Sequence, residues 1–308
     1  MNKIKHIVQS QQFTWEFLDR LFSLADEMKG NTGSIRSDGK ILASLFYEPS
    51  TRTRLSFESA MLQLGGSIIS TENAKEFSSH SKGESLEDSI KVINGYADII
   101  AIRHFEIGAA KRAAGVSDIP VINAGDGSGQ HPTQALLDLY AIKRHFQEID
   151  GLTVCMVGDL KYGRTVRSLC YLLGKFYKIK FIFVASPICR MNRDILSYLD
   201  EMRVGWAEEE SFTRAISQSD CVYMTRVQKE RFLDMKLYAK AQTQFRIDSK
   251  TVQYLKKDAI VLHPLPRLEE IHPEVDSDPR MQYFDQAKNG VWVRMALMAL
   301  LLNPDLQP

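Results

Sequence analysis

Paired cysteines, long apolar runs and an excess of either charge are all missing from this 308-residue sequence. The four cysteines lie far apart and form no CxxC pair, which fits reduced, buried thiols better than a disulfide framework or a zinc site. Lysine and arginine total 39 against 38 acidic residues, so the net charge of +1 offers nucleic acid or a membrane surface no general attraction. Any anion-binding site must therefore be local.

Targeting segments and two standard phosphate loops are also lacking. The first residues, MNKIKHIVQSQQFTWEF, contain no apolar core of a signal peptide, and the late apolar segment VWVRMALMALLL is too short to span a bilayer. No GxxxxGKS or GxxxxGKT loop occurs, and GDGSGQ lacks the last glycine of a GxGxxG loop, so nucleotide binding loses support. We expect a soluble, cytoplasmic protein without a nucleic-acid or membrane partner.

The length is about twice that of one domain, which predicts two domains. Strand-like runs alternate with segments of helical period, first at 41–47, 98–102 and 119–124, and again at 152–157, 179–184, 220–225 and 259–263. The alternation predicts two doubly wound α/β domains, each with a parallel sheet flanked by helices and with the active site in the cleft between them. We place the domains at 1–150 and 151–285, with a final helix at 286–308 that packs back on the first domain.

Donor side chains crowd the stretch FYEPSTRTRLSFESAMLQLGG at residues 46–66. A strand-like run ends there at a proline turn, and apolar residues then recur at helical spacing from Phe57 to Leu64. The donors between them lie where free backbone N–H groups and the positive end of a helix favour an anion, and where an arginine can hold a phosphate through two parallel hydrogen bonds. The stretch predicts a phosphate site, although alone it also suits an ordinary helix cap with solvated arginines.

Two more polar clusters belong to the first half of the chain. The segment AGDGSGQHPTQ delivers His131 and Gln134 to the start of a helix, where a histidine can donate to a polarised oxygen and a glutamine can bind an amide. The segment SSHSKGES carries Ser78 and Lys82 in a polar loop that contains a glycine. Taken alone, the histidine suits a structural role and the second segment is simply a loop.

Three clusters follow strands of the second half. VGDLKYGRT places Arg164 near a helix start, and MTRVQKERF places Arg226 and Gln228 on one face of an extended segment, where they could bind a carboxylate. IVLHPLPR puts prolines after a buried strand and leaves backbone carbonyls without a sheet partner. Together, these polar strand ends indicate a ligand site that works by positioning and charge stabilisation, because no nucleophile with its base and no metal-binding set accompanies them.

Five segments, FYEPSTRTRLSFE, NAGDGSGQHPTQ, VGDLKYGRT, YMTRVQKER and HPLPR, resemble in order the signature segments of the aspartate carbamoyltransferase family. STRTR and HPTQ are shared with ornithine carbamoyltransferases, so they indicate only that carbamoyl phosphate is bound. RVQKER and HPLPR favour aspartate, because the ornithine enzymes have an HCLP pattern where this sequence has Pro264. The sequence departs from the family pattern at Ser81, Phe105, Gly129 and Arg167.

The resemblance implies a role for each matching residue. In the first domain, which would bind carbamoyl phosphate, the phosphate would be held by Ser50, Thr51, Arg52, Thr53 and Arg103. The carbonyl oxygen would be polarised by Thr53, Arg103 and His131, and the carbamoyl amide would be bound by Gln134 and by the backbone carbonyls of Pro264 and Leu265. The carboxylates of aspartate would be bound in the second domain by Arg164, Arg226 and Gln228. A neighbouring subunit of a trimer would contribute Ser78 to carbamoyl phosphate and Lys82 to aspartate and catalysis, and interdomain ion pairs would join Glu48 to Arg164 and Arg231.

The implied reaction transfers the carbamoyl group of carbamoyl phosphate to the α-amine of L-aspartate and yields N-carbamoyl-L-aspartate and phosphate, an early step of pyrimidine biosynthesis. It needs no cofactor and no metal. The implied partners are the two substrates and two further copies in a homotrimer with shared active sites, and a separate regulatory chain is compatible with the family. Two alternatives are a related carbamoyltransferase acting on another amino acid and a non-catalytic sensor of phosphorylated metabolites.

Overall fold

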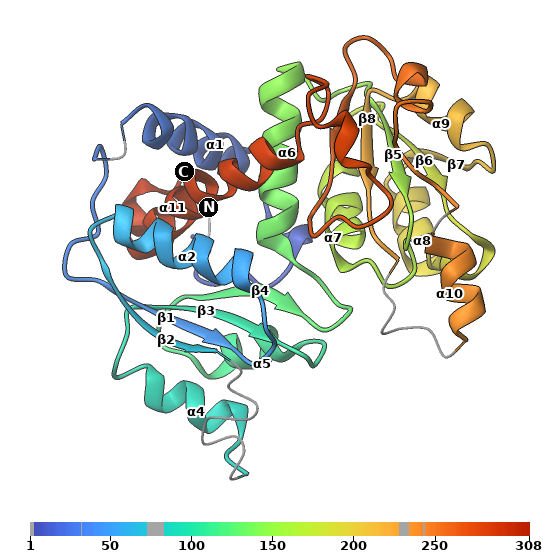
Figure 1. Ribbon diagram of the computed structural model, residues 1–308. Coiled ribbons are helices and arrows are strands. Elements are labelled where there is room, and N and C mark those ends of the chain that lie inside the picture. Colours follow the sequence, from blue (N-terminus) through green and yellow to red (C-terminus); the bar gives the residue numbers. More distant parts are fainter. Residues whose placement is uncertain (1–2, 32, 73–82, 228–233, 243) are drawn as a thin grey trace. The chain divides into compact units, whose positions relative to one another are not determined.

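The computed structural model describes residues 3–31, 33–72, 83–227, 234–242 and 244–308 (Figure 1). The chain divides into two units, unit 1 with Met1–Leu137 and Lys288–Pro308, and unit 2 with Asp138–Ala287. Among the described residues, no helix is long and apolar enough to cross a membrane.

Unit 1 is built on a parallel sheet in the order β2-β1-β3-β4. Its strands are β1 (Ile41–Phe46), β2 (Ser67–Glu72), β3 (Ile99–His104) and β4 (Val121–Asp126). Its helices are α1 (Trp15–Gly30), α2 (Thr51–Gln63), α4 (Leu86–Ile93) and α5 (Ala109–Val116). Two more helices cross the boundary between the units, α6 (Pro132–Phe146) and α11 (Tyr283–Leu302).

Both faces of this sheet are covered, as is usual for parallel sheets. On one face, alternate side chains of β1 and β3 form a cluster with α4 and α5 that includes Leu45, Ile102, Ile90 and Ala113. Figure 1 shows α1, α2 and the end of α11 on the opposite face. Because both faces are buried, β1, β3 and β4 have nearly continuous buried sequences, whereas the edge strand β2 is mostly exposed.

The first residues of the chain cover the other edge of the sheet. Ile7 bridges to β4 through a hydrogen bond from its N–H to the carbonyl of Val121 (2.8 Å) and one to its own carbonyl from the N–H of Asn123 (2.7 Å). The two ends of the chain meet nearby, where the N–H of Ile4 donates to Oε1 of Gln307 at 2.8 Å. Within the described residues of unit 1, β2 is therefore the edge that remains open.

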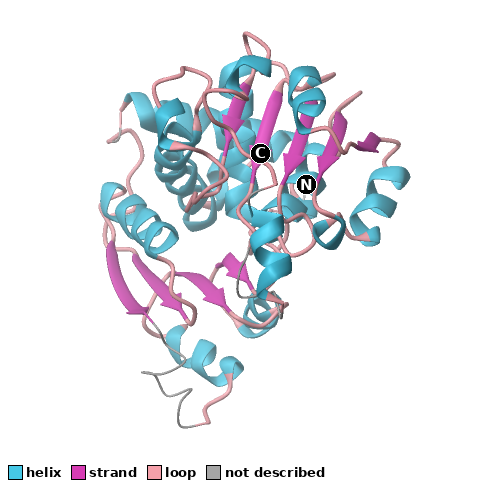
Figure 2. Cartoon of the chain, turned by 45° about the vertical axis from the view of Figure 1, so that its right-hand side comes forward, coloured by secondary structure: helices cyan, strands magenta, loops and turns pink. Residues whose placement is uncertain are grey.

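Unit 2 is built on a second parallel sheet, in the order β7-β6-β5-β8-β9, between helices on both faces (Figure 2). Its strands are β5 (Thr153–Val157), β6 (Lys180–Val184), β7 (Gly205–Glu208), β8 (Cys221–Met224) and β9 (Ile260–Leu262). Its helices are α7 (Arg164–Leu173), α8 (Arg193–Glu201), α9 (Phe212–Gln218) and α10 (Met235–Gln242). Ala215 and Ile216 of α9 pack in a core cluster with Cys155 and Val222 of the central strands.

The predicted fold class, two α/β domains with parallel sheets flanked by helices, is confirmed. Each predicted strand corresponds to a strand of the structure. The strands β2 and β7, one edge strand of each sheet, were not predicted. These strands bury few side chains, so they lack the apolar pattern by which the others are predicted.

Candidate functional site

In unit 1, the predicted phosphate-binding residues gather at the carboxyl ends of three adjacent strands. Parallel strands end at the same edge of a sheet, which is where α/β proteins bind ligands. Arg103 lies in β3 itself, and two hydrogen bonds hold the strand ends together: the N–H of Tyr47 donates to the carbonyl of Arg103, and the N–H of Gly127 donates to the carbonyl of His104, both at 2.9 Å. Ser50 follows β1 and His131 follows β4, so the structure brings these groups to one edge.

The amino end of α2 has the features of an anion site. Ser50 is the N-cap residue, but its side chain makes no capping hydrogen bond, and the first turn of the helix contains no acidic residue. The N–H groups of that turn and the positive end of the helix dipole therefore remain available to an anion. Thr51 and Arg52 are exposed there, whereas Thr53 is buried.

The second arginine of the STRTR motif has a different place. The guanidinium of Arg54 pairs with Glu72 of β2 at 2.9 Å and with Glu58 at 3.6 Å. Glu58 also accepts hydrogen bonds from the hydroxyls of Ser44 (3.0 Å) and Ser70 (2.7 Å). Arg54 thus ties α2 to β2, so the alternative of solvated arginines is wrong for this residue.

The side chain of Arg103 is mostly buried and forms an ion pair with an acidic residue. Its side chain is 14% exposed, and its Nη2 lies 3.1 Å from Oε2 of Glu48. This ion pair connects the end of β3 with the segment that follows β1. The predicted pairs of Glu48 with Arg164 and Arg231 involve unit 2 and stay predictions, and Arg231 lies outside the described residues.

The loop before α6 places His131 and Gln134 in buried positions. Asp126 shapes this loop, because its carboxylate accepts from the N–H of Gly108 at 2.7 Å and from the N–H of Gln130 at 2.8 Å. His131 is 4% exposed, and its Nδ1 lies 3.5 Å from Oγ1 of Thr133. When Nδ1 accepts from that hydroxyl, Nε2 carries the proton and is the donor. The role of Asp126 was not predicted, although an aspartate between two glycines, as in AGDGSGQHPTQ, is a signal for a turn.

In unit 2, Arg164 and Arg226 follow two adjacent strands. The ends of β5 and β8 pair through Val157 and Met224. Thr225 secures them, since its hydroxyl donates to the carbonyl of Val157 at 2.9 Å and accepts from the N–H of Asp159 at 3.1 Å. The role of Thr225 was not predicted from the MTRVQKERF segment.

Glycine is required where the first of these loops begins. Gly158 has φ +110°, and a Cβ there would lie 2.2 Å from the carbonyl oxygen of Thr225. Arg164 is the first residue of α7, which starts six residues later, and Arg226 directly follows Thr225. The close packing of the two strand ends thus fixes the starting points of the two segments that carry Arg164 and Arg226.

The third strand end of unit 2 carries the predicted carbonyl groups. β9 pairs with β8, and His263, Pro264 and Leu265 follow it at the same edge of the sheet. Leu265 has a left-handed backbone with φ +53°, and its bond to Pro266 is cis. The four remaining predicted site residues, Ser78, Lys82, Gln228 and Arg231, lie outside the described residues.

The cysteine side chains are not among the predicted substrate-binding groups. All four are free and buried, which confirms the prediction of reduced, buried thiols. Burial raises the pKa of Cys189 to about 11 and raises that of Cys155 and Cys170 further, so these thiols are protonated near pH 7 and are poor nucleophiles. Among the described residues, no group of three or more His, Cys, Asp or Glu side chains is arranged to hold a metal ion.

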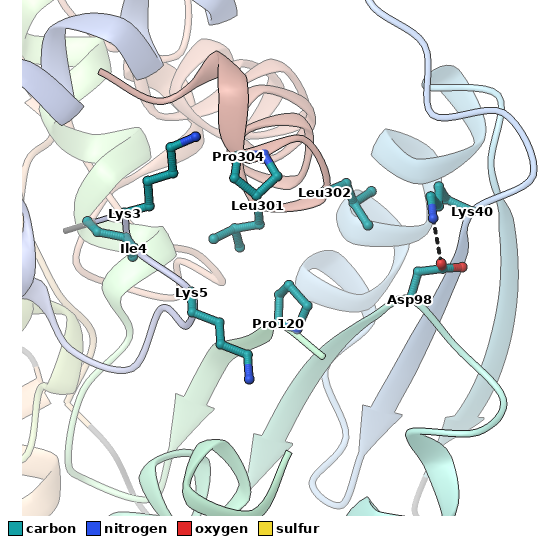
Figure 3. Close-up of a pocket in the computed structure, with 9 residues that line it drawn as sticks. All are labelled: Lys3, Ile4, Lys5, Lys40, Asp98, Pro120, Leu301, Leu302 and Pro304. Atoms are coloured by element: carbon teal, nitrogen blue, oxygen red, sulfur yellow. Dashed lines mark hydrogen bonds and ion pairs between the residues drawn. The ribbon is translucent and has the colours of Figure 1, made fainter. Parts of the chain in front are cut away.

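A pocket of about 290 Å³ lies in unit 1 at the amino ends of the strands, opposite the carboxyl ends that carry the predicted phosphate-binding residues (Figure 3). Its lining includes Lys40, Asp98 and Pro120, which directly precede β1, β3 and β4. Figure 3 shows Lys40 joined to Asp98, at 2.8 Å, and Lys3 on the same pocket pairs with Asp305 at 2.8 Å. The ammonium groups of these two lysines are already paired, and the pocket is at the amino ends of the strands, so we do not assign it to the substrates.

Family models match both units. Residues 5–144 match the aspartate/ornithine carbamoyltransferase carbamoyl-P binding domain, and residues 150–301 match the aspartate/ornithine carbamoyltransferase Asp/Orn binding domain. The chain belongs to the aspartate/ornithine carbamoyltransferase family. The strand ends of unit 1 therefore belong to the region matched by the carbamoyl-P model, and those of unit 2 to the region matched by the Asp/Orn model.

Relatives within this family favour one of its two branches. The chain is 51% identical to the chloroplastic aspartate carbamoyltransferase of Oryza sativa, over 97% of this chain and 85% of the relative. It is 49% identical to the aspartate carbamoyltransferase catalytic subunit of Clostridium perfringens, over 98% of this chain and 99% of the relative. Similarity at this level, over almost the full length of the chain, makes it a carbamoyltransferase of the aspartate type.

Solved structures agree with the fold. The catalytic subunit of M. jannaschii aspartate transcarbamoylase superposes with a TM-score of 0.89 at 45% identity, over 97% of this chain and 98% of that chain. Aspartate transcarbamoylase from Trypanosoma cruzi in complex with N-(phosphonacetyl)-L-aspartic acid superposes with a TM-score of 0.91 at 37% identity, over 98% and 97% of the two chains.

Three of the residues that depart from the family pattern make close contacts in the structure. Arg167 forms a bidentate ion pair with Asp194 of α8. Phe105 stacks on the ring of His104, with 4.3 Å between the ring centroids. Gly129 sits where a Cβ would lie 2.8 Å from Oδ1 of Asp126, so the loop is closely packed there. Ser81 lies outside the described residues.

Proposed function

We propose that this enzyme transfers the carbamoyl group of carbamoyl phosphate to the α-amine of L-aspartate. The observation that carries the proposal is the set of donors at the carboxyl ends of β1, β3 and β4, centred on the uncapped amino end of α2. A helix end without an acidic residue, next to Arg52, suits a phosphate group. The relatives of about half identity that carry the name aspartate carbamoyltransferase support the choice of reaction.

In this proposal, unit 1 binds carbamoyl phosphate. Ser50–Thr53 and Arg103 hold the phosphate, and Thr53, Arg103 and His131 donate to the carbonyl oxygen, which gains negative charge when the amine attacks. The side-chain oxygen of Gln134 and the carbonyls of Pro264 and Leu265 accept hydrogen bonds from the carbamoyl N–H₂ group. The burial of His131 and Gln134 supports these roles, because a buried donor is little weakened by water.

Unit 2 binds aspartate through Arg164 and Arg226, together with Gln228. The amine nitrogen forms a bond to the carbonyl carbon, and the bond from that carbon to the phosphate oxygen breaks. We propose that the departing phosphate takes the proton that the amine loses, so no protein base is needed. Catalysis then rests on positioning and on stabilising charge.

A phosphate-release assay tests the proposal. The enzyme is given carbamoyl phosphate with aspartate, with ornithine, or with no amine, and both phosphate and the carbamoylated product are measured. We expect turnover with aspartate only. Turnover with ornithine or another amine would support the related carbamoyltransferase, and binding of carbamoyl phosphate without product would support a non-catalytic sensor.

Arg226→Ala should raise the KM for aspartate about a hundredfold, because it removes charge-assisted hydrogen bonds to a carboxylate. The affinity for carbamoyl phosphate should change little, since that substrate is assigned to other residues. Steady-state kinetics with each substrate varied in turn gives both constants. Equal damage to both constants would contradict the assignment of Arg226 to aspartate.

We also propose that the enzyme is a homotrimer in which Ser78 and Lys82 of one subunit serve the site of the next. Exposed apolar side chains on α2 and on the open edge strand β2 support a subunit contact there: Leu55 is 50% exposed, Leu62 60% and Ile69 39%. Leu55 and Leu62 are seven residues apart and so share one face of the helix. Exposed apolar side chains beside an unpaired strand edge are typical of interfaces.

Leu62→Asp should therefore convert trimers to monomers and remove most activity, because the charge would be buried in an apolar contact. Analytical ultracentrifugation gives the assembly state, and circular dichroism checks the fold. Val92→Asp is the matched control, since Val92 is also half exposed (50%) but belongs to α4. A folded Leu62→Asp protein that stays trimeric would place the interface elsewhere, and a fully active monomer would contradict the shared site.

A further inference from the structure

His263 is a buried histidine whose two ring nitrogens have different partners. The side chain lies at the end of β9 and is 2% exposed. Its Nδ1 accepts from the backbone N–H of Leu265 at 2.8 Å, and its Nε2 lies 2.8 Å from Oε1 of Glu270. Because a backbone N–H can only donate, Nδ1 must be unprotonated. The proton is therefore on Nε2, which donates to the carboxylate of Glu270.

The hydrogen bond to Nδ1 fixes the direction of a carbonyl group. The carbonyl of Pro264 and the N–H of Leu265 belong to one peptide plane, and in a trans peptide they point in opposite directions. Holding the N–H on the imidazole thus turns the carbonyl of Pro264 away from it. Leu265 has φ +53°, a conformation that residues with a side chain rarely adopt, so this turn needs support from its surroundings.

Glu270 holds the imidazole in this tautomer. Its Oε1 also accepts from the N–H of Leu268 at 3.0 Å, and the residue is 4% exposed. Burial would raise the pKa of the Glu270 carboxyl, but the hydrogen bonds from His263 and from backbone N–H groups outweigh it and leave the pKa below its usual value. The carboxylate is ionised near pH 7 and accepts the Nε2–H.

A buried chain of hydrogen bonds also holds the backbone of His263. The N–H of His263 donates to Oε1 of Gln286 at 2.9 Å, and Nε2 of Gln286 donates to Oδ1 of Asp138 at 2.5 Å. Asp138 also accepts from the hydroxyl of Tyr223 at 2.7 Å. Gln286, Asp138 and Tyr223 are at most 1% exposed, and buried networks with every member paired are rigid. His263 therefore has both its backbone and its ring held in place.

We propose that His263 is a positioning residue that sets the enzyme's preference for a substrate bearing an amide N–H₂. By holding the N–H of Leu265, the imidazole keeps the carbonyl of Pro264 turned outward as an acceptor for the carbamoyl amide. The inference rests on the proposed function, in which that carbonyl binds carbamoyl phosphate. It adds that recognition of the amide depends on one acceptor nitrogen of a residue that does not touch the substrate.

Acetyl phosphate is a probe that separates this role from a general structural one. It keeps the phosphate and the carbonyl of carbamoyl phosphate but has a methyl group in place of the amide nitrogen, so it cannot donate to a carbonyl. The dissociation constants of both ligands are measured by calorimetry on the full-length enzyme. The readout is their ratio, which a merely destabilising change would leave unaltered.

Two substitutions divide the functions of the imidazole. In H263N the side-chain oxygen takes the place of Nδ1 and can accept from Leu265, whereas in H263Q the amide takes the place of Nε2 and can donate to Glu270. H263Q should lower the preference for carbamoyl phosphate over acetyl phosphate about tenfold, the cost of misplacing one buried acceptor. H263N should keep the preference within about twofold of the unmodified enzyme, although both variants lose one hydrogen bond.

The outcomes distinguish the role of His263 from the proposed function. An unmodified enzyme that binds both ligands equally would contradict the amide contact and with it the inference, whereas the absence of turnover in the phosphate-release assay would contradict the proposed function. Clear preference in the unmodified enzyme with an unchanged ratio in H263Q would overturn the role of His263 and leave the proposed function standing. Should H263Q fail to fold, ¹⁵N spectra of histidine-labelled unmodified enzyme decide, because a protonated Nδ1 on His263 overturns the inference and an unprotonated Nδ1 supports it.

Discussion

Arg52→Ala should lower kcat/KM for carbamoyl phosphate by about a thousandfold, with part of the loss in kcat. Arg52 is the second residue of α2, in the turn whose N–H groups are free to bind an anion, and its guanidinium can bind a phosphate through two charge-assisted hydrogen bonds. The phosphate gains charge as it leaves, so the contact strengthens in the transition state and its loss lowers kcat as well as binding. Steady-state kinetics with saturating aspartate gives both constants.

The controls separate charge from geometry. Arg52→Lys keeps the positive charge but loses the planar pair of donors, so it should fall between the unmodified enzyme and the alanine variant. Arg112→Ala removes an equal charge from the surface of α5, where Arg112 pairs with Glu87 and Glu106, and should leave the kinetics unchanged. An Arg52→Ala enzyme with normal kcat and a raised KM would show that this arginine only binds the substrate.

The buried strands and the loops at their ends could be predicted because the pattern that indicates them lies within a short stretch of sequence. Buried parallel strands are short apolar runs, and a strand followed by a turn and an apolar helix predicts a ligand edge without knowledge of the partner strand. The edge strands β2 and β7 were not predicted, because the apolar pattern comes from burial of the side chains and these two strands are mostly exposed. Arg54 was misjudged as a possible solvated side chain for a related reason: its partner Glu72 lies in one of the missed strands.

The residues that support the site could not be predicted in this way. Asp138 accepts from Tyr223, 85 residues away, and from Gln286, 148 residues away, and neither spacing marks a contact in the sequence. His263 stood inside a quoted motif, but its role depends on Glu270, across an irregular loop with a left-handed residue. Residues that contact a substrate share a strand end, whereas residues that hold those contacts are brought together only by the packed fold.

His131→Ala should lower kcat by about a hundredfold to a thousandfold, the usual effect of removing one donor to a developing oxyanion. The KM for either substrate should change much less, because the carbonyl oxygen carries its full negative charge only after the amine attacks. The buried position of His131 favours a large effect, since water cannot readily replace the lost donor. Single-turnover measurements separate the chemical step from product release.

The tautomer of His131 gives this prediction a sharper form. The hydroxyl of Thr133 lies 3.5 Å from Nδ1, so a proton on Nε2 is the arrangement in which the ring donates to the carbonyl oxygen. His131→Gln retains a donor near the position of Nε2 and should recover part of the lost kcat, whereas His131→Asn retains only the position of Nδ1 and should match the alanine variant. Recovery by asparagine but not glutamine would assign the donor to Nδ1, and a change confined to KM would show that His131 stabilises no charge in the transition state.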